Sequence, residues 1–307
     1  MMKKFLIKLA LFFSLALVFT GYVVFKIGGS FDHHYLRFTS GRQQSLILGT
    51  SRAARGIQPK VLNKRLQGKQ FYNFAFNANI SPYGPVYFRA IKKKLEPKAS
   101  QGIYILVISP IHFLNELRVK DDTLRFRELS RCLAKTKYVN LNPNVFYLLN
   151  NYENFIYEYL RNFNQDKWFL HDDGWLEVNA GTKDPKVLTK RRNNVAKRMK
   201  SNVGKVYFSE IRWQYFIKTI QLLKKHGEVY LVRLPVDKQI LDIEDKYMPG
   251  FDTLIDNAFD NNVPYFDMTH MADDFIFNDG SHLNKKSSEE VSRLIGEWIL
   301  STNAQNP

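Results

Sequence analysis

Cysteine and glycine-rich loops are scarce in this sequence, and each shortage narrows what the chain can be. Cys132 is the only cysteine among 307 residues, which excludes an intrachain disulfide. With no histidine paired to it nearby, Cys132 is interpreted as a core residue rather than a nucleophile. No glycine-rich phosphate-binding loop and no set of metal ligands is visible, so the sequence predicts neither a metal site nor a cofactor.

The longest apolar run lies at the N-terminus. Residues 5–27 are almost wholly apolar, and their uninterrupted part, residues 9–25, is near the short limit for a membrane-spanning helix. An uncleaved anchor and a cleaved signal peptide are both open, and the anchor is favoured because no clear Ala-x-Ala site precedes Ser30. Lys3 and Lys4 predict a cytoplasmic N-terminus, with the main domain outside, in the periplasm or the extracellular space.

Acidic side chains are also in the minority. Against 29 aspartates and glutamates stand 45 lysines and arginines, giving a formal net charge of +16. This surplus favours acidic neighbours, such as anionic lipid headgroups, anionic glycans or nucleic acid. Nucleic acid is not expected as a partner, because a location outside the cell would separate the two and no binding motif is visible. The densest basic run, residues 183–200, is interpreted as a solvated face.

Short apolar runs alternate with helical patterns along much of the chain. Strands are predicted at residues 45–48, 70–76, 103–108, 229–234 and 264–267, and helices at 59–66, 83–95, 209–226, 250–261 and 285–300. Asn284 is placed to cap the last of these helices. Strand and helix alternate about five times, which predicts an α/β fold with a doubly wound parallel sheet.

The alternation breaks between about residues 114 and 204. We interpret this region as a helical insertion over the edge of the sheet, serving as a substrate lid or a membrane-facing surface. The expected organisation is therefore a membrane anchor at residues 1–28, a polar linker at 29–44 and an α/β domain with its insertion at 45–307.

Two short stretches far apart in the chain carry the chemistry. Ser51 follows Gly49 at the end of a predicted strand, and Asp279 and His282 lie three positions apart in a polar loop. A serine becomes a nucleophile when a base takes its proton, and histidine does so best when a carboxylate fixes its tautomer. Either stretch alone is compatible with helix capping. Together they predict that His282 reaches Ser51 while Asp279 holds its other ring nitrogen.

These residues resemble the motifs of a known family. Leu48-Gly49-Thr50-Ser51-Arg52, with Asp279-Gly280-Ser281-His282-Leu283-Asn284 near the C-terminus, is similar to the SGNH/GDSL hydrolase superfamily, above all to membrane-anchored members such as the teichoic-acid D-alanylation protein. Asn73-Phe74-Ala75 before Ser81-Pro82-Tyr83, and the strand end Val107-Ile108-Ser109-Pro110, add to the likeness. The resemblance covers most of the chain after about residue 44 and implies a flavodoxin-like sheet of SGNH type with esterase or O-acyltransferase activity.

The chain departs from this family in the part that binds the oxyanion. Family members often carry a glycine in the second block, where this chain has Ala75-Phe76-Asn77-Ala78-Asn79. The third block, Gly-x-Asn, is not evident after Ser109. Asn77 and Asn79 are therefore the candidate oxyanion contacts, since an amide side chain can donate a hydrogen bond, and Asn73 is interpreted as structural.

Three arginines are candidates for substrate binding. Arg52 and Arg55 lie beside the proposed nucleophile, and Arg233 lies at the end of a predicted strand. Each has two open interpretations. One is solvent exposure or a structural ion pair; the other is recognition of an anionic substrate or acyl donor, because a guanidinium can bind a carboxylate or phosphate through two hydrogen bonds.

The resemblance and the residues together predict a serine-dependent esterase or O-acyltransferase. Ser51 is the expected nucleophile, His282 the base and then the acid, and Asp279 the residue that orients His282. The expected substrate is an acylated cell-envelope polysaccharide or other surface glycan, or an acyl donor, attacked through an acyl-enzyme. The alternative, motivated by the missing glycine blocks, is a non-catalytic SGNH-like docking or assembly component of the cell envelope. Hydrolysis and acyl transfer are both left open.

Overall fold

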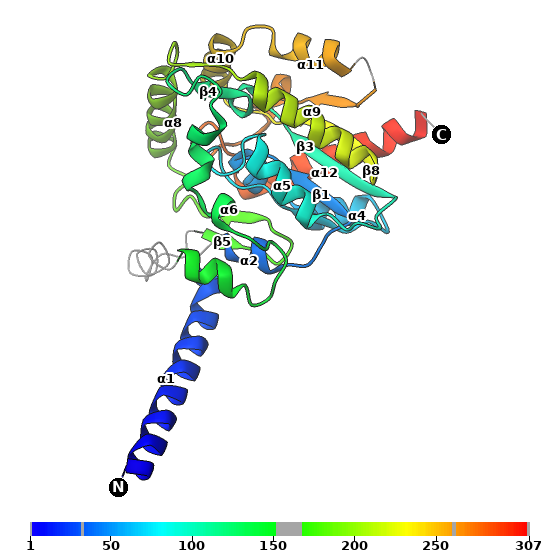
Figure 1. Ribbon diagram of the computed structural model, residues 1–307. Helices are drawn as coiled ribbons and strands as arrows, with labels where there is room; N and C mark the ends of the chain where they lie inside the picture. Colours follow the sequence, from blue (N-terminus) through cyan, green and yellow to red (C-terminus); the bar gives the residue numbers. More distant parts are fainter. Residues whose placement is uncertain (1, 32–33, 152–167, 260–261, 306–307) are drawn as a thin grey trace.

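A five-stranded sheet, all of its strands parallel, forms the centre of the molecule (Figure 1). The computed structural model describes residues 2–31, 34–151, 168–259 and 262–305. Along the sheet the strands follow the order β2 (Phe71–Asn73), β1 (Ser45–Leu48), β3 (Gly102–Val107), β8 (Gly227–Arg233) and β9 (Tyr265–Asp267). The predicted α/β fold with a parallel sheet is therefore confirmed.

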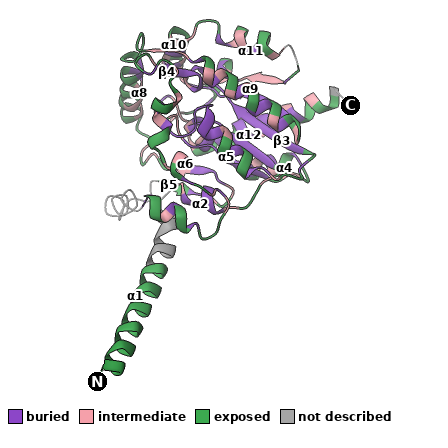
Figure 2. Ribbon diagram, viewed as in Figure 1, coloured by how far each residue is buried: buried purple, intermediate pink, exposed green. Residues whose placement is uncertain are grey.

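Helices cover both faces of this sheet. On one face lie α5 (Pro85–Lys94), α9 (Glu210–Lys224) and α11 (Phe251–Phe259), and on the other α3 (Ser51–Gly56), α4 (Pro59–Arg65) and α12 (Lys285–Gln305). Successive side chains of a strand point to opposite faces. Leu46 and Leu48 of β1 accordingly join the first core, and Ile47 joins the second. Because both faces are buried (Figure 2), the central strands are continuous apolar runs, which is the pattern that the sequence shows.

A long apolar helix projects from the body at the N-terminus. α1 (Met2–Phe31) contains an apolar stretch, Met2–Tyr22, with a mean hydropathy of 2.0 and no part of it buried inside the protein. Figures 1 and 2 show this helix extending away from the sheet with its surface exposed. The predicted N-terminal apolar helix is thus present, and its length and composition suit a signal anchor or a signal sequence alike.

The segment expected as a polar linker is partly folded into the core. It contains the short helix α2 (Tyr35–Thr39), in which Tyr35 and Phe38, one turn apart, are buried among the aromatic side chains of the first core. The buried ammonium of Lys94 in α5 donates hydrogen bonds to the carbonyl oxygens of Arg37 (2.9 Å) and Ser40 (2.5 Å) at the end of α2. From Tyr35 onward, residues 29–44 therefore pack onto the body, and the predicted polar linker is in this part a folded segment.

The insertion is closed at its neck by a short antiparallel ladder. β4 (Leu114–Glu116) pairs with β7 (Val206–Phe208), so the two ends of the insertion meet close to the predicted limits of 114 and 204. The prediction of a helical insertion is only partly right, because the region also contains a β-hairpin. Its other elements are η2 (Thr123–Arg125), η3 (Arg127–Ser130), α6 (Cys132–Lys135), a helical turn over residues 145–151, β5 (Trp168–Leu170), β6 (Leu176–Val178) and α8 (Pro185–Lys200).

Three further helices complete the chain around the sheet. The short 3-10 helices η1 (Pro110–His112) and η4 (Thr269–Asp274) follow β3 and β9. α10 (Lys238–Tyr247) was not predicted from the sequence. It begins at Asp237, whose carboxylate accepts the N–H of Gln239 at 2.9 Å, and it packs Ile240 and Ile243 against α8.

Candidate active site

The turn after β1 presents Ser51 at the carboxyl end of the sheet. Gly49 has a φ of 141°, and a Cβ added there would lie 3.0 Å from the side chain of Ala53 and 3.1 Å from Val107, so only glycine fits. The Gly49 N–H donates to the hydroxyl of Tyr87 at 3.1 Å, and its carbonyl accepts the hydroxyl of Ser81 at 2.7 Å. Ser51 then opens α3 as its first residue, where its hydroxyl is only half-buried.

The loop before α12 is folded around the carboxylate of Asp279. Oδ1 of Asp279 accepts the backbone N–H groups of Ser281 and His282, each at 3.0 Å. Gly280 adopts a φ of 80° in this turn, a left-handed conformation that glycine tolerates best. The loop is anchored to the final helix by Asn284, whose side-chain oxygen accepts the N–H of Ser287 at 2.8 Å, as expected for a helix cap.

The two stretches meet, although 231 residues separate them. Nε2 of His282 lies 2.8 Å from Oγ of Ser51, and Nδ1 of His282 lies 2.9 Å and 3.0 Å from the two oxygens of Asp279. Because a carboxylate can only accept, Nδ1 carries the ring proton and Nε2 is left to accept the hydroxyl proton of Ser51. The contacts expected between Ser51, His282 and Asp279 are therefore all present, and their geometry is the one that a serine nucleophile and its base require.

The surroundings keep this pair in the protonation states that nucleophilic attack requires. Burial, followed by the positive charge of Arg55, lowers the pKa of the His282 imidazole below its usual value, so the ring is a free base at neutral pH. Burial acts to raise the pKa of Asp279, but the hydrogen bond from His282 and the positive charges nearby hold it well below its usual range. Asp279 is thus ionised and His282 neutral before substrate binds.

Arg52 and Arg233 are engaged in buried ion pairs. Nη2 of Arg52 lies 2.7 Å from the carboxylate of Glu244 in α10, and Nε donates to Oγ of Ser281 at 3.2 Å. Arg233 at the end of β8 pairs with Asp252 and lies 3.7 Å from the same Glu244. Both arginines are less than a tenth exposed. Their charges are therefore balanced within the protein, and Arg52 ties the loop of His282 to α10.

Arg55 is different, because its guanidinium makes no direct ion pair among the residues that the structure describes, and the nearest acidic influence on it is the charge of Asp279. Its guanidinium carbon lies 4.4 Å from the centre of the Trp168 ring, and its buried Nε has no hydrogen-bond partner in that part of the chain. The backbone carbonyl of Arg55 accepts the indole N–H of Trp175 at 2.9 Å, which fixes the hairpin β5–β6 against α3. Burial lowers the pKa of Arg55 to about 10, so the side chain remains charged at neutral pH.

The two asparagines proposed for the oxyanion differ in their surroundings. Asn77 is half-buried, and its side-chain oxygen accepts the N–H of the exposed Asn79 at 2.9 Å, which leaves the amide N–H groups of Asn77 to donate. Ser81 fastens this loop to the nucleophile turn, since its hydroxyl bonds both Phe76 N–H (3.1 Å) and the carbonyl of Gly49. Asn77 is therefore the more buried candidate of the two, with its amide N–H groups available to donate.

Asn73 has a structural position, as the sequence suggested. Its buried amide donates to the carbonyl oxygens of Ala53 (2.8 Å) and Ile57 (3.0 Å), which closes the C-terminal end of α3. Its backbone N–H donates to the carbonyl of Asp173 in the turn of the β5–β6 hairpin at 2.8 Å. Through its side chain and its backbone, Asn73 thus joins β2, α3 and the insertion into one support for the turn of Ser51.

Sequence reasoning missed the partners that the insertion and α10 supply. Glu244 and Trp168 carry no local motif, and only the fold brings them to Arg52 and Arg55. The two tryptophans of the hairpin, seven positions apart around a polar turn, were the one visible signal. No protein-family model matches this chain and no curated protein matches it by sequence, so the site is interpreted from its own geometry.

Proposed function

We propose that this protein is a serine-dependent esterase or O-acyltransferase of SGNH type that acts on an acylated cell-envelope glycan. The observation that carries the proposal is the 2.8 Å contact between Ser51 Oγ and His282 Nε2, with the carboxylate of Asp279 on the other ring nitrogen. The strand order and the helices on both faces support a doubly wound, flavodoxin-like sheet, in which sites form at the carboxyl ends of the strands. Ser51 follows β1 at that edge.

The reaction that fits these residues has two steps. The hydroxyl of Ser51 attacks an ester carbonyl while Nε2 of His282 takes its proton, and the resulting imidazolium is stabilised by Asp279. His282 then gives the proton to the departing alkoxide, which leaves an acyl group on Ser51. In the second step His282 takes a proton from water or from a sugar hydroxyl, which attacks the acyl-enzyme, and His282 then returns the proton to Oγ of Ser51 as the bond to the acyl group breaks. Asn77 is the proposed donor to the oxyanion formed in each step.

The contrast among the arginines supports an anionic substrate. Arg52 and Arg233 form direct ion pairs with carboxylates, whereas Arg55 forms none within the described residues and lies near His282 and Asp279. A guanidinium stacked on an indole keeps its hydrogen-bonding edges available for a carboxylate or a phosphate. The proposed role of Arg55 is to bind such a group on the glycan or on the acyl donor.

The proposed location is the outer face of a cell membrane. α1 is taken as an uncleaved anchor with its N-terminus in the cytoplasm, because Lys3 and Lys4 precede the apolar stretch and the body follows it. The mass of the protein recovered from membranes tests this directly. A mature chain that lacks residues 1–28 would show that α1 is a cleaved signal sequence.

Labelling with a serine-directed fluorophosphonate tests the enzymatic proposal. The full-length protein is expected to react at Ser51, and the Ser51→Ala variant is expected to lose the label while its circular dichroism spectrum is unchanged. Ser281→Ala is the matched control, because Ser281 lies in the loop of His282 and its hydroxyl accepts from Arg52 without an imidazole partner in the described structure. Unchanged labelling of Ser51→Ala would remove Ser51 from the proposed role.

The non-catalytic alternative rests on a specific observation. The second loop, residues 75–79, has no glycine, and the Gly-x-Asn block of the resembled family is not evident after β3. A folded wild-type protein that shows no labelling and no hydrolysis of aryl esters would favour an SGNH-like docking or assembly component over an enzyme.

A further inference from the structure

The body exposes a group of large apolar side chains close to the base of α1. Val145, Phe146 and Leu149 lie on a helical turn over residues 145–151 and are 53%, 48% and 66% exposed, and Leu141 just before them is also exposed. The opposite side of the same turn is buried through Tyr147. We call Leu141, Val145, Phe146 and Leu149 the apolar face. The turn therefore packs one apolar side against the body and leaves the other apolar side open to a further contact.

This turn is fixed directly to the segment that follows α1. The ring of Tyr147 stacks on Phe38 of α2 at 4.7 Å, and the side-chain amide of Asn144 donates to the carbonyl of Phe38 at 3.1 Å. The hydroxyl of Tyr35 accepts the N–H of Asn144 at 3.3 Å. Tyr35 follows the end of α1 at Phe31 by four residues. The apolar face therefore cannot move independently of the point where α1 enters the body.

The length of α1 places this point at a bilayer surface. A helix of 30 residues is about 45 Å long at 1.5 Å per residue. A bilayer with its headgroups is about 40–45 Å thick. If α1 crosses the membrane, its whole length lies within the bilayer and its headgroups. The segment α2 and the turn over residues 145–151 then lie directly on the headgroups.

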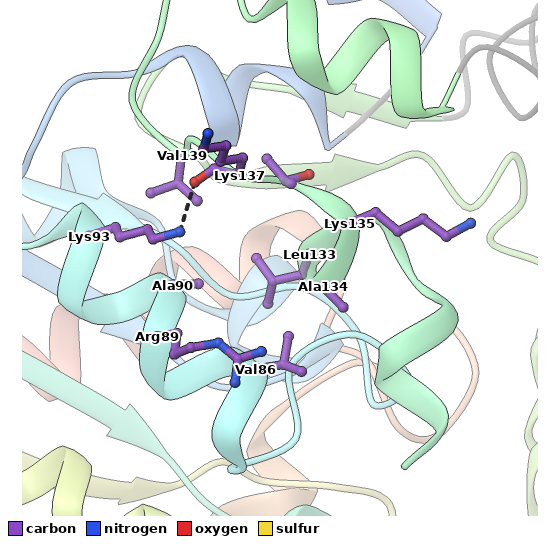
Figure 3. Close-up of a pocket in the computed structure, with 10 residues that line it drawn as sticks. Val86, Arg89, Ala90, Lys93, Leu133, Ala134, Lys135, Lys137 and Val139 are labelled. Carbon is purple, nitrogen blue, oxygen red and sulfur yellow. Dashed lines mark hydrogen bonds between the residues drawn. The ribbon is translucent and has the colours of Figure 1, made fainter. Parts of the chain in front are cut away.

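Basic and aromatic side chains flank the apolar face. The ring of Tyr138 lies 5.1 Å from that of Phe146, and the side chain of Asn150 donates to the backbone carbonyl of Lys135 at 3.3 Å. Figure 3 shows the adjoining cavity of about 190 Å³ between α5 and residues 133–139, with exposed Lys93 and Lys135 at its edge and Lys93 bonded to the carbonyl of Lys137 at 2.7 Å. None of these three lysines forms an ion pair within the described ranges. Aromatic and aliphatic residues beside unpaired lysines are the composition of helices that lie in a membrane interface.

We propose that the apolar face is a second membrane contact, seated in the headgroup region of an anionic lipid bilayer with Lys93, Lys135 and Lys137 against lipid phosphates. This inference rests on α1 being retained as an anchor and is independent of the catalytic proposal. The contact would hold the body at one fixed orientation to the membrane. The occupant is a lipid surface because the face continues from the membrane helix and because the neighbouring charges are positive.

Site-directed spin labelling of the full-length protein in nanodiscs tests this contact. In a Cys132→Ser background, which leaves no other cysteine, a nitroxide is attached at Leu149→Cys. The matched control is Leu300→Cys, which replaces a comparably exposed apolar residue in α12, near the C-terminus and far from the end of α1 (Figure 1). Oxygen concentrates in lipid and a charged nickel chelate in water. The ratio of oxygen to nickel accessibility is expected to be several-fold higher at 149 than at 300 in discs that contain phosphatidylglycerol.

Lipid charge and the lysines sharpen the test. Discs of phosphatidylcholine alone are expected to lower the ratio at 149, and Lys135→Gln with Lys137→Gln is expected to lower it only in the anionic discs. Equal ratios at 149 and 300 would overturn the membrane contact. A label at 149 that is shielded from both reagents would also overturn it, because it would show a protein partner on this face.

Discussion

The side of the candidate site that holds Ser51, His282 and Asp279 is fixed more firmly than the side proposed to bind the oxyanion. The carboxylate of Asp279 accepts two backbone N–H groups and the ring of His282, and Arg52 fixes the same loop through Ser281. The loop on the other side is fastened by Ser81, while its candidate donor Asn77 is only half-buried.

This difference shows which of the proposed contacts are already formed without a substrate. A general base must lie within hydrogen-bond reach of the proton that it takes, and here the ring of His282 already lies 2.8 Å from the hydroxyl of Ser51. Oxyanion donors are needed only when charge develops on the substrate. The proton-transfer side is therefore complete in the structure, and the oxyanion side is where the enzymatic proposal is most exposed to test.

The largest effect is expected on the firmly held side. Asp279→Asn keeps the shape of the loop but no longer fixes the tautomer or supports the imidazolium of His282, so kcat for an aryl acetate should fall by about 10³–10⁴-fold. Initial rates at saturating ester concentration measure this fall in kcat. The exposed Asp274, five residues earlier, provides the control, and Asp274→Asn should change the rate by less than about twofold. Full activity of Asp279→Asn would contradict the proposed mechanism.

A smaller effect is expected on the oxyanion side. Asn77→Ala should lower kcat by about 10²-fold with little change in KM, because the lost hydrogen bond is made mainly to the developing oxyanion. Asn79→Ala is the matched comparison, since that side chain is exposed, and it should leave kcat nearly unchanged. If both variants keep wild-type rates, the oxyanion is bound by backbone N–H groups alone and the two sides of the site are more alike than their side chains indicate.

Substitution of the two neighbouring arginines should affect different properties, stability for Arg52 and activity for Arg55. Arg52→Gln leaves the fully buried carboxylate of Glu244 without its closest cation, so the free energy of unfolding should fall by about 3 kcal/mol. Arg55→Gln breaks no ion pair within the described residues and should leave the unfolding midpoint in urea nearly unchanged. It should instead lower kcat/KM for an aryl ester with a carboxylate in its acyl group by about tenfold, relative to the neutral acetate. Equal losses on both esters would exclude Arg55 as an anion-binding residue.

Much of this site could be read from the sequence because its signals are local. Gly49 and Ser51 directly follow a buried strand, and Asp279 and His282 are close enough in sequence to share one turn. A parallel sheet brings strand ends to one edge, so the fold class predicts that the two stretches meet.

The rest depends on pairings that no local pattern records. Arg52 and Arg55 are three positions apart on α3, yet only folding gives the first a buried glutamate from α10 and the second the ring of Trp168 from the insertion. α2 was missed for a related reason, because its two buried aromatic residues lie in a five-residue helix that is too short to show a period.

The smallest predicted effect is a shift in the pH dependence of activity, caused by the charge of Arg55 acting on His282. Below its pKa, His282 is protonated and cannot accept the proton of Ser51, so kcat/KM is lost as the pH falls through that pKa. Burial and then Arg55 lower this pKa below about 6.5, the ordinary value for an imidazole, so the acid limb of the profile should lie below that pH. Arg55→Gln removes a positive charge that disfavours the imidazolium, which should raise the pKa and move the limb to higher pH, whereas Arg55→Lys should leave it close to wild type. The profile is measured with a neutral ester, so that anion binding does not contribute, and a limb that stays in place in Arg55→Gln would show that burial alone sets the pKa of His282.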